Sequence, residues 1–265
     1  MSSIDDRFAR LRDSGGKALV CFVTAGDPNL ETTRRIVLDL EQAGADIVEL
    51  GVPFSDPIAD GPSIQASSMR ALESGTNVPK VLDLVRSIRR ESDLPLVLMT
   101  YYNLVEHYGL SRFADDAGSA GVDGVILSDL PPEDAGEWKS AADGRGISTI
   151  FLLAPTSTDS RIRRVAELAS GFIYCVSRTG VTGARADMAE GVRDLVVRIR
   201  SATDKPIAVG FGISTPEHVR EVCGYADGAV VGSVLVNLIA EKTGSADFST
   251  ELRNLVSALK AGTRP

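Results

Sequence analysis

Short runs of aliphatic and β-branched residues recur along the chain, and the longer segments between them carry apolar residues at helical spacing. Most of these runs are continuously apolar rather than alternating, which is typical of parallel strands covered on both faces. We therefore predict strands over residues 18–24, 47–51, 96–99, 124–128, 148–153, 172–176, 207–210 and 228–232. Strands that alternate with helices form a parallel sheet, and eight such units predict a (β/α)8 TIM barrel. No linker divides the chain, so residues 1–265 are expected to form one domain.

Two parts of the pattern depart from a regular repeat. The segment after the second predicted strand has room for a loop and two helical patterns, over residues 63–74 and 79–90. Another helical pattern, over residues 4–11, precedes the first strand, and we expect it to plug the N-terminal end of the barrel. Further helix starts are predicted at Thr215, which precedes Pro216, and at Asp159.

Composition and charge narrow the classes of function. Lys+Arg number 28 against 36 Asp+Glu, and the net charge of −8 disfavours nucleic acid and anionic membranes as partners, because both select basic surfaces. No apolar run reaches the roughly 18 residues of a membrane span, and the N-terminal residues lack the apolar core of a signal peptide. The three cysteines are far apart and odd in number, which indicates reduced thiols in a cytoplasmic protein.

The metal-ligating and nucleophilic residues exclude two kinds of chemistry. His107 and His218 are the only histidines and lie far apart, so we expect no metal site. A Schiff-base enzyme of this architecture needs a lysine near the carboxyl end of a strand. Lys17 and Lys205 precede strands, at the wrong end, and the other four lysines lie in helical patterns.

Two carboxylates are candidates for acid–base catalysis. Glu49 lies close to the carboxyl end of an apolar strand, which is the end where barrel enzymes place their active sites. Asp60 lies on the loop that follows, a stiff segment with three prolines in residues 53–62. A buried carboxyl has a raised pKa, and two carboxyls in different environments can divide the acid and base roles. The alternatives are a structural ion pair for Glu49 and an ordinary Asp-Gly turn for Asp60.

Glycine-rich loops predict where an anion binds. Gly210 and Gly212 follow the seventh strand, and Gly232 and Ser233 follow the eighth, each shortly before a helix. These two loops form the recurrent phosphate site of the architecture, although either alone is also typical of an ordinary turn. Residues 177–185 form a polar, glycine-rich loop after the sixth strand, which predicts either a lid or a plain surface loop. Four aromatic residues near strand ends indicate a flat apolar ligand, unless they belong to the core: Phe22, Tyr101, Tyr174 and Phe211.

The segment 48–62, VELGVPFSDPIADGP, closely resembles the tryptophan synthase alpha subunit family. The resemblance extends over nearly the whole chain and includes the segments 22–28, 101–103, 177–183, 210–214 and 232–233. It implies a retro-aldol cleavage of indole-3-glycerol phosphate to indole and glyceraldehyde 3-phosphate. It also implies a beta subunit partner in an alpha2beta2 complex, with pyridoxal phosphate in the beta subunit and no cofactor in this chain.

The resemblance assigns roles to individual residues. It implies that Glu49 and Asp60 are catalytic, and that Pro53 and Asp56 face the beta subunit. The residues that it implies bind substrate are Phe22, Tyr101, Tyr174, Thr182, Gly183, Phe211, Gly212, Gly232 and Ser233. Three alternatives remain open at this point: a lyase that works without a partner, another phosphosugar enzyme such as an isomerase, and a regulatory subunit without catalytic activity.

Overall fold

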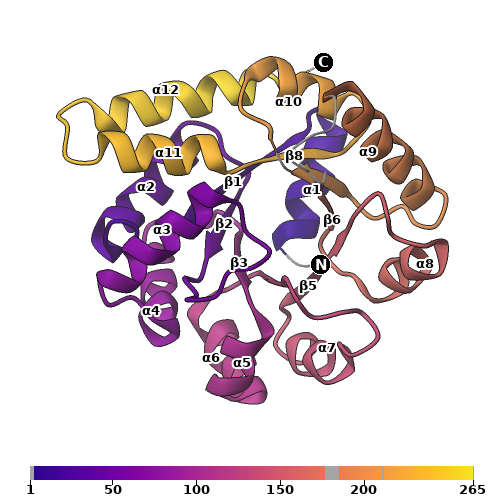
Figure 1. Cartoon of the computed structure of the whole chain (residues 1–265), viewed down its shortest axis with the longest axis horizontal. Coiled ribbons are helices and arrows are strands. Elements are labelled where there is room, and N and C mark those ends of the chain that lie inside the picture. Colours follow the sequence, from indigo (N-terminus) through magenta and orange to yellow (C-terminus); the bar gives the residue numbers. More distant parts are fainter. Residues whose placement is uncertain (1–2, 177–184, 211, 265) are drawn as a thin grey trace.

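The computed structural model describes residues 3–176, 185–210 and 212–264. Within these residues eight parallel strands pair in chain order, and β1 also pairs with β8, which closes the barrel. Figure 1 shows the strands as an inner ring enclosed by helices. The strands are β1 (Ala18–Thr24), β2 (Ile47–Gly51), β3 (Leu96–Thr100), β4 (Gly124–Leu127), β5 (Ser148–Leu153), β6 (Ile173–Val176), β7 (Ile207–Gly210) and β8 (Gly228–Val231). The predicted (β/α)8 architecture is confirmed.

The helices follow the predicted alternation, with a few additions. The two helices expected after β2 are present as α3 and α4. A second pair, α5 and α6, fills the segment after β3; Gly109, with a φ of 93°, separates the two helices. The helices are α1 (Ser3–Asp13), α2 (Leu30–Gln42), α3 (Pro62–Glu73), α4 (Val78–Ile88), α5 (Tyr102–Tyr108), α6 (Leu110–Ala120), α7 (Gly136–Asp143), α8 (Asp159–Leu168), α9 (Arg185–Arg200), α10 (Pro216–Cys223), α11 (Ser233–Lys242) and α12 (Phe248–Ala261).

Small differences at element ends have identifiable causes. Thr215 caps α10 as predicted, since its hydroxyl accepts the His218 N–H at 3.3 Å. Asp159, by contrast, is the first residue of α8, and Thr158 is its cap. The eighth strand ends one residue before the predicted Gly232, because Gly232 already flanks the first turn of α11.

The N-terminal helix closes one end of the barrel, as the sequence predicts. Ile4 and Phe8 of α1 are buried and belong to the same apolar cluster as inward-facing strand residues such as Val20 and Ile150. The Phe8 and Phe172 rings lie 5.8 Å apart. A separate and larger core fills the layer between the strands and the outer helices. Since α1 covers the N-terminal ends of the strands, their carboxyl ends form the open mouth.

Side-chain oxygens bind the backbone in a repeating manner at the closed end. Each acceptor side chain lies just before an even-numbered strand. It accepts a hydrogen bond from a backbone N–H of the preceding odd-numbered strand, at the first or second residue of that strand. The four pairs are Leu19–Asp46, Leu96–Asp123, Thr149–Ser170 and Ile207–Asp227, with N–O distances of 2.7, 2.8, 2.8 and 2.9 Å. These bonds fix the base of the barrel without involving the mouth.

Candidate active site

Glu49 lies on β2, level with Phe22 of β1 and Val97 of β3. Val97 belongs to the inner apolar cluster, so Glu49 also projects into the barrel. Only 1% of the residue is exposed, and neither carboxyl oxygen has a hydrogen-bond partner among the described residues. The structural ion pair considered from the sequence is therefore not observed. Burial raises the pKa of Glu49 to about 8, with a further contribution from the charge of Asp60, so the carboxyl is mainly neutral at pH 7.

Asp60 is held over the same end of the barrel by the loop between β2 and α3. Its N–H donates to the Pro57 carbonyl at 3.0 Å, and the N–H of Ala59 donates to the Tyr101 hydroxyl at 3.1 Å. Burial raises the pKa of Asp60 to about 6, while a hydrogen bond with Tyr101 limits the rise. At neutral pH Asp60 is therefore mainly ionised beside a neutral Glu49, and the two carboxyls have opposite protonation states.

A cavity of about 580 Å³ brings most of the predicted site residues together at the mouth. The predicted residues that line it are Phe22, Glu49, Asp60, Tyr174, Gly212, Gly232 and Ser233. Tyr101 lines a smaller, neighbouring cavity that also borders Asp60. The two carboxyls thus line one cavity that is large enough for a drug-sized ligand.

Aromatic rings form part of the cavity wall, and two glycines make room for them. A side chain at Gly51 would lie 2.6 Å from the Phe22 ring, and one at Gly210 would lie 2.3 Å from the Tyr174 hydroxyl. The absence of a side chain at both positions therefore allows the outer ends of the rings to approach the neighbouring strands closely. The structure places Phe22 and Tyr174 where a planar apolar ligand would contact them.

Another part of the cavity wall is suited to an anion. Gly212 has a φ of 71°, which favours glycine, and Gly232 and Ser233 lead directly into α11. No side chain caps α11, so backbone N–H groups of its first turn remain available to a ligand. Among the described residues that line the cavity none is basic, and the helix N-terminus is its source of positive potential.

Three of the predicted residues cannot be placed. Thr182, Gly183 and Phe211 lie outside the described residues. Of the two residues expected to face a partner, Asp56 is exposed on the β2–α3 loop, whereas Pro53 is buried.

Several residues that line the cavity were not expected from the sequence. Ile64 and Asn237 lie in the first two turns of α3 and α11, and Met99 lies on the inner face of β3. The signal that could have located Ile64 and Asn237 is their position in the helices that directly follow two of the predicted site loops. Met99 shares the inward alternation of Val97, which could have located it in the same way.

Other parts of the described structure offer no comparable site. A cavity of about 430 Å³ lies at the closed end, beneath α1, and three of the charged groups that line it are paired, since Arg200 and Lys17 both contact Asp227. No group of three or more His, Cys, Asp or Glu among the described residues could hold a metal ion. No helix in the described part of the chain is long and apolar enough to cross a bilayer.

Fold and site together define a (β/α)8-barrel enzyme whose cavity combines two carboxyls, aromatic rings and a helix N-terminus. The chain belongs to the tryptophan synthase alpha chain family, whose model matches residues 8–264. It is 56% identical to the tryptophan synthase alpha chain of Geotalea daltonii, over 99% of both chains. Among solved structures, the tryptophan synthase subunit alpha of Legionella pneumophila is similar, with 35% identity, a TM-score of 0.91 and 99% and 98% of the two chains covered. A tryptophan synthase structure from M. tuberculosis matches with 33% identity and a TM-score of 0.90, over 100% of both chains.

Proposed function

We propose that this chain is the alpha chain of a tryptophan synthase and cleaves indole-3-glycerol phosphate to indole and D-glyceraldehyde 3-phosphate. The observation that carries the proposal is the pairing of a neutral Glu49 with an ionised Asp60 in one cavity. The aromatic wall suits the indole ring, and the N-terminus of α11 suits the phosphate. Membership of the family supports the same reading.

The reaction requires an acid at the ring. The bond between indole C3 and the glycerol carbon breaks only after C3 accepts a proton, because the departing ring must retain the bonding electrons. Glu49 donates that proton, and the ring nitrogen becomes positively charged. Asp60 stabilises this charge as an anion, which explains why the two carboxyls need different protonation states.

The same glutamate completes the cleavage. As a carboxylate, Glu49 removes the proton from the hydroxyl on the adjacent glycerol carbon, and the oxygen electrons form the aldehyde C=O. The electron pair of the breaking C–C bond returns to the ring and restores neutral indole. Glu49 finishes protonated, ready for the next substrate, so the cycle requires no other proton donor.

We infer that the β2–α3 loop takes part in docking the beta subunit. Ile58 is 90% exposed at this loop and lies between the exposed Asp56 and the catalytic Asp60. Ile58 is the most exposed large apolar side chain among the described residues, and a partner that covers it would remove this apolar surface from water. Pro53 is buried and supports this loop from beneath. Pyridoxal phosphate is expected in the beta subunit of an alpha2beta2 complex, and the free cysteines favour a cytoplasmic location.

The test is indole release from indole-3-glycerol phosphate by the purified chain, measured alone and with a beta subunit. We expect slow release by the chain alone and faster release in the complex. Release at the same fast rate without the partner would identify a lyase that works alone. No release under either condition would overturn the proposal.

A further inference from the structure

Helix α3 directly follows the β2–α3 loop that carries Asp60, since the helix begins at Pro62, two residues after Asp60. Its first turn holds Asp60 directly: the Gln65 side-chain amide donates to the Asp60 carbonyl at 2.9 Å and to the Pro57 carbonyl at 3.4 Å. The position of the Asp60 backbone therefore follows the position of α3.

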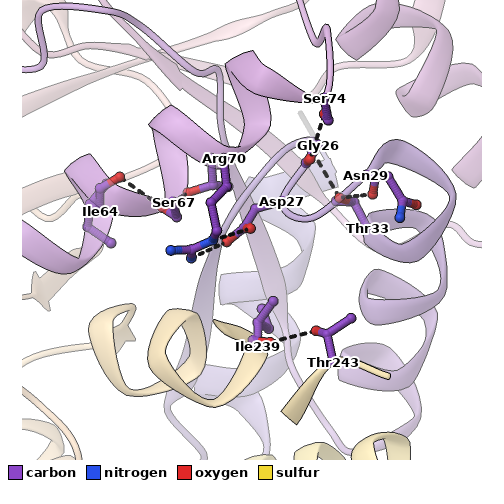
Figure 2. A network of polar contacts seen from close by, with 11 residues as sticks. Gly26, Asp27, Asn29, Thr33, Ile64, Ser67, Arg70, Ser74, Ile239 and Thr243 are labelled. Carbon is purple, nitrogen blue, oxygen red and sulfur yellow. Dashed lines mark hydrogen bonds and ion pairs between the residues drawn. The ribbon is translucent and has the colours of Figure 1, made fainter. Parts of the chain in front are cut away.

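A polar stripe on α3 fixes the helix against the loop between β1 and α2. Ser67, Arg70 and Ser74 form this stripe, at helical spacings of three and four, and Figure 2 shows Arg70 directed at Asp27 and Ser74 at Gly26 of that loop. The Ser67 hydroxyl lies 2.6 Å from the Thr24 hydroxyl, and the Ser74 hydroxyl donates to the Gly26 carbonyl at 3.1 Å. We refer to these contacts and the Arg70 contact as the α3 anchor.

The charged member of the anchor has a specific geometry. Arg70 donates to both carboxylate oxygens of Asp27, from Nε at 2.8 Å and from a terminal nitrogen at 2.7 Å. Asp27 is only 3% exposed and Arg70 is the cation that pairs with it, whereas the Arg70 side chain is 35% exposed. A bidentate pair fixes direction as well as distance, which a lysine ammonium cannot reproduce.

We propose that Arg70 and Gln65 are positioning residues for Asp60: Arg70 sets the place of α3, and Gln65 transmits that place to the Asp60 backbone. The inference rests on the proposed function, in which Asp60 stabilises charge on the indole ring. A helix that shifts without its anchor carries Asp60 away from the ring nitrogen. A misplacement of about 1 Å can lower a rate as much as 100-fold.

A displacement of Asp60 changes the pKa values of both Asp60 and Glu49. The titratable groups that face Asp60 in the described structure are Glu49 from β2, Tyr101 from the residue that follows β3, and Tyr174 from β6. If Asp60 moves away from Tyr101, it loses the hydrogen bond that lowers its pKa, and its pKa rises. The charge of Asp60 then also acts less on Glu49, and the pKa of Glu49 falls. In a profile of kcat/KM against pH, the acid limb, set by Asp60, therefore moves to higher pH, and the alkaline limb, set by Glu49, moves to lower pH. Loss of stability alone does not cause these two shifts.

The test compares the Gln65→Ala and Arg70→Lys variants of the full chain with two matched controls. Gln65 is exposed, so its loss costs little stability. The first control is Gln42→Ala, at an exposed position at the end of α2. The second is Arg253→Lys, whose arginine on α12 pairs with Asp39 of α2 at 2.6 Å. We expect kcat/KM for indole release to fall roughly 3- to 30-fold in the two test variants only. The interval between the two limbs should narrow by about 0.5 pH unit or more, and Arg70→Met should show a larger effect than Arg70→Lys.

Carboxyl-carbon NMR titration of Glu49 and Asp60 without substrate reads the same shifts independently of activity. A chain that fails to release indole would overturn the proposed function, while the NMR titration would still decide the positioning role. Unchanged limbs and unchanged titrations in Gln65→Ala and Arg70→Lys, or equal changes in the controls, would overturn the inference.

Discussion

At the scale of single residues, Glu49 is notable for the partners that it lacks. Its oxygens are covered by protein, yet in the described structure no donor or cation meets them. Leaving a buried polar group unpaired costs free energy, and a folded protein keeps such a group where catalysis needs it. Apolar neighbours along β2 predict the burial, but the sequence did not reveal that no arginine or lysine from another element pairs with it.

Glu49→Gln is expected to abolish most activity and to stabilise the fold. Glutamine has the same shape but cannot donate and retrieve a proton, so cleavage should fall by about 100- to 10,000-fold. The pKa of Glu49 is raised from 4.5 in the unfolded chain to about 8, so folded stability falls as pH rises between these values. Glutamine removes this penalty, and we expect roughly 3–5 kcal/mol of added stability at pH 8. Indole release and urea unfolding check the two effects; a variant that is fully active contradicts the assignment.

The pH dependence of kcat/KM is expected to be bell-shaped. Activity should rise as Asp60 ionises around its raised pKa of about 6 and fall as Glu49 loses its proton around its pKa of about 8. Since the two carboxyls interact, the limbs report the pair rather than either residue alone. Initial rates of indole release across pH 5–9 measure the profile, and the Asp60→Asn variant should lose the acid limb together with most of its turnover. A profile with no acid limb in the unaltered chain contradicts the role of Asp60.

At the scale of elements, the two ends of the strands have different tasks. Side chains that precede the strands, such as Asp46 and Asp123, bind the backbone of the neighbouring strand, while residues near the strand carboxyl ends form the cavity. Apolar runs were sufficient to predict the strands to within one residue, because parallel strands are buried on both faces. The helix pair α5 and α6 was missed because their separation depends on the conformation of Gly109 and not on a hydrophobic pattern.

Asp46→Ala tests the role of the closed end. Asp46 is 5% exposed, accepts the Leu19 N–H and pairs with Lys260. Its removal leaves the buried Leu19 N–H without a partner and Lys260 without its carboxylate, so we expect a loss of about 2–4 kcal/mol in urea unfolding. The control Asp83→Ala removes an exposed carboxylate from a helical pair with Arg86 and should change stability by less than about 0.5 kcal/mol. The folded Asp46→Ala variant should retain its cleavage rate. Equal stability of Asp46→Ala and Asp83→Ala would contradict the role of Asp46 in stabilising the closed end.

At the scale of the whole molecule, the carboxyl ends of the strands gather chemistry from distant parts of the sequence. Phe22, Glu49, Tyr174 and Ser233 come from four different β/α units and line one cavity. The barrel architecture predicts this convergence, which is why most of the site could be located without a structure. The architecture could not predict how far each loop residue is buried. Pro53 is buried and Ile58 is exposed, although both lie in the same loop.

Ile58→Asp is expected to weaken the alpha–beta complex without affecting the isolated chain. The side chain is 90% exposed, so the substitution should leave stability nearly unchanged. A charge placed in an apolar contact should lower affinity for the beta subunit by about 10-fold or more. Isothermal titration with the beta subunit measures this, and Val197→Asp, at another exposed aliphatic position (63%), is the control. If Ile58→Asp and Val197→Asp bind the beta subunit with equal affinity, the beta subunit does not contact the β2–α3 loop at Ile58.

The unpartnered oxygens of Glu49 also have a consequence for inhibitor design. A compound that brings an amidinium group to this glutamate would supply the counter-ion that the protein withholds, and would favour the carboxylate over the acid. Such a compound should bind more tightly as the solution becomes alkaline, because the protein then no longer has to release a proton for the complex to form.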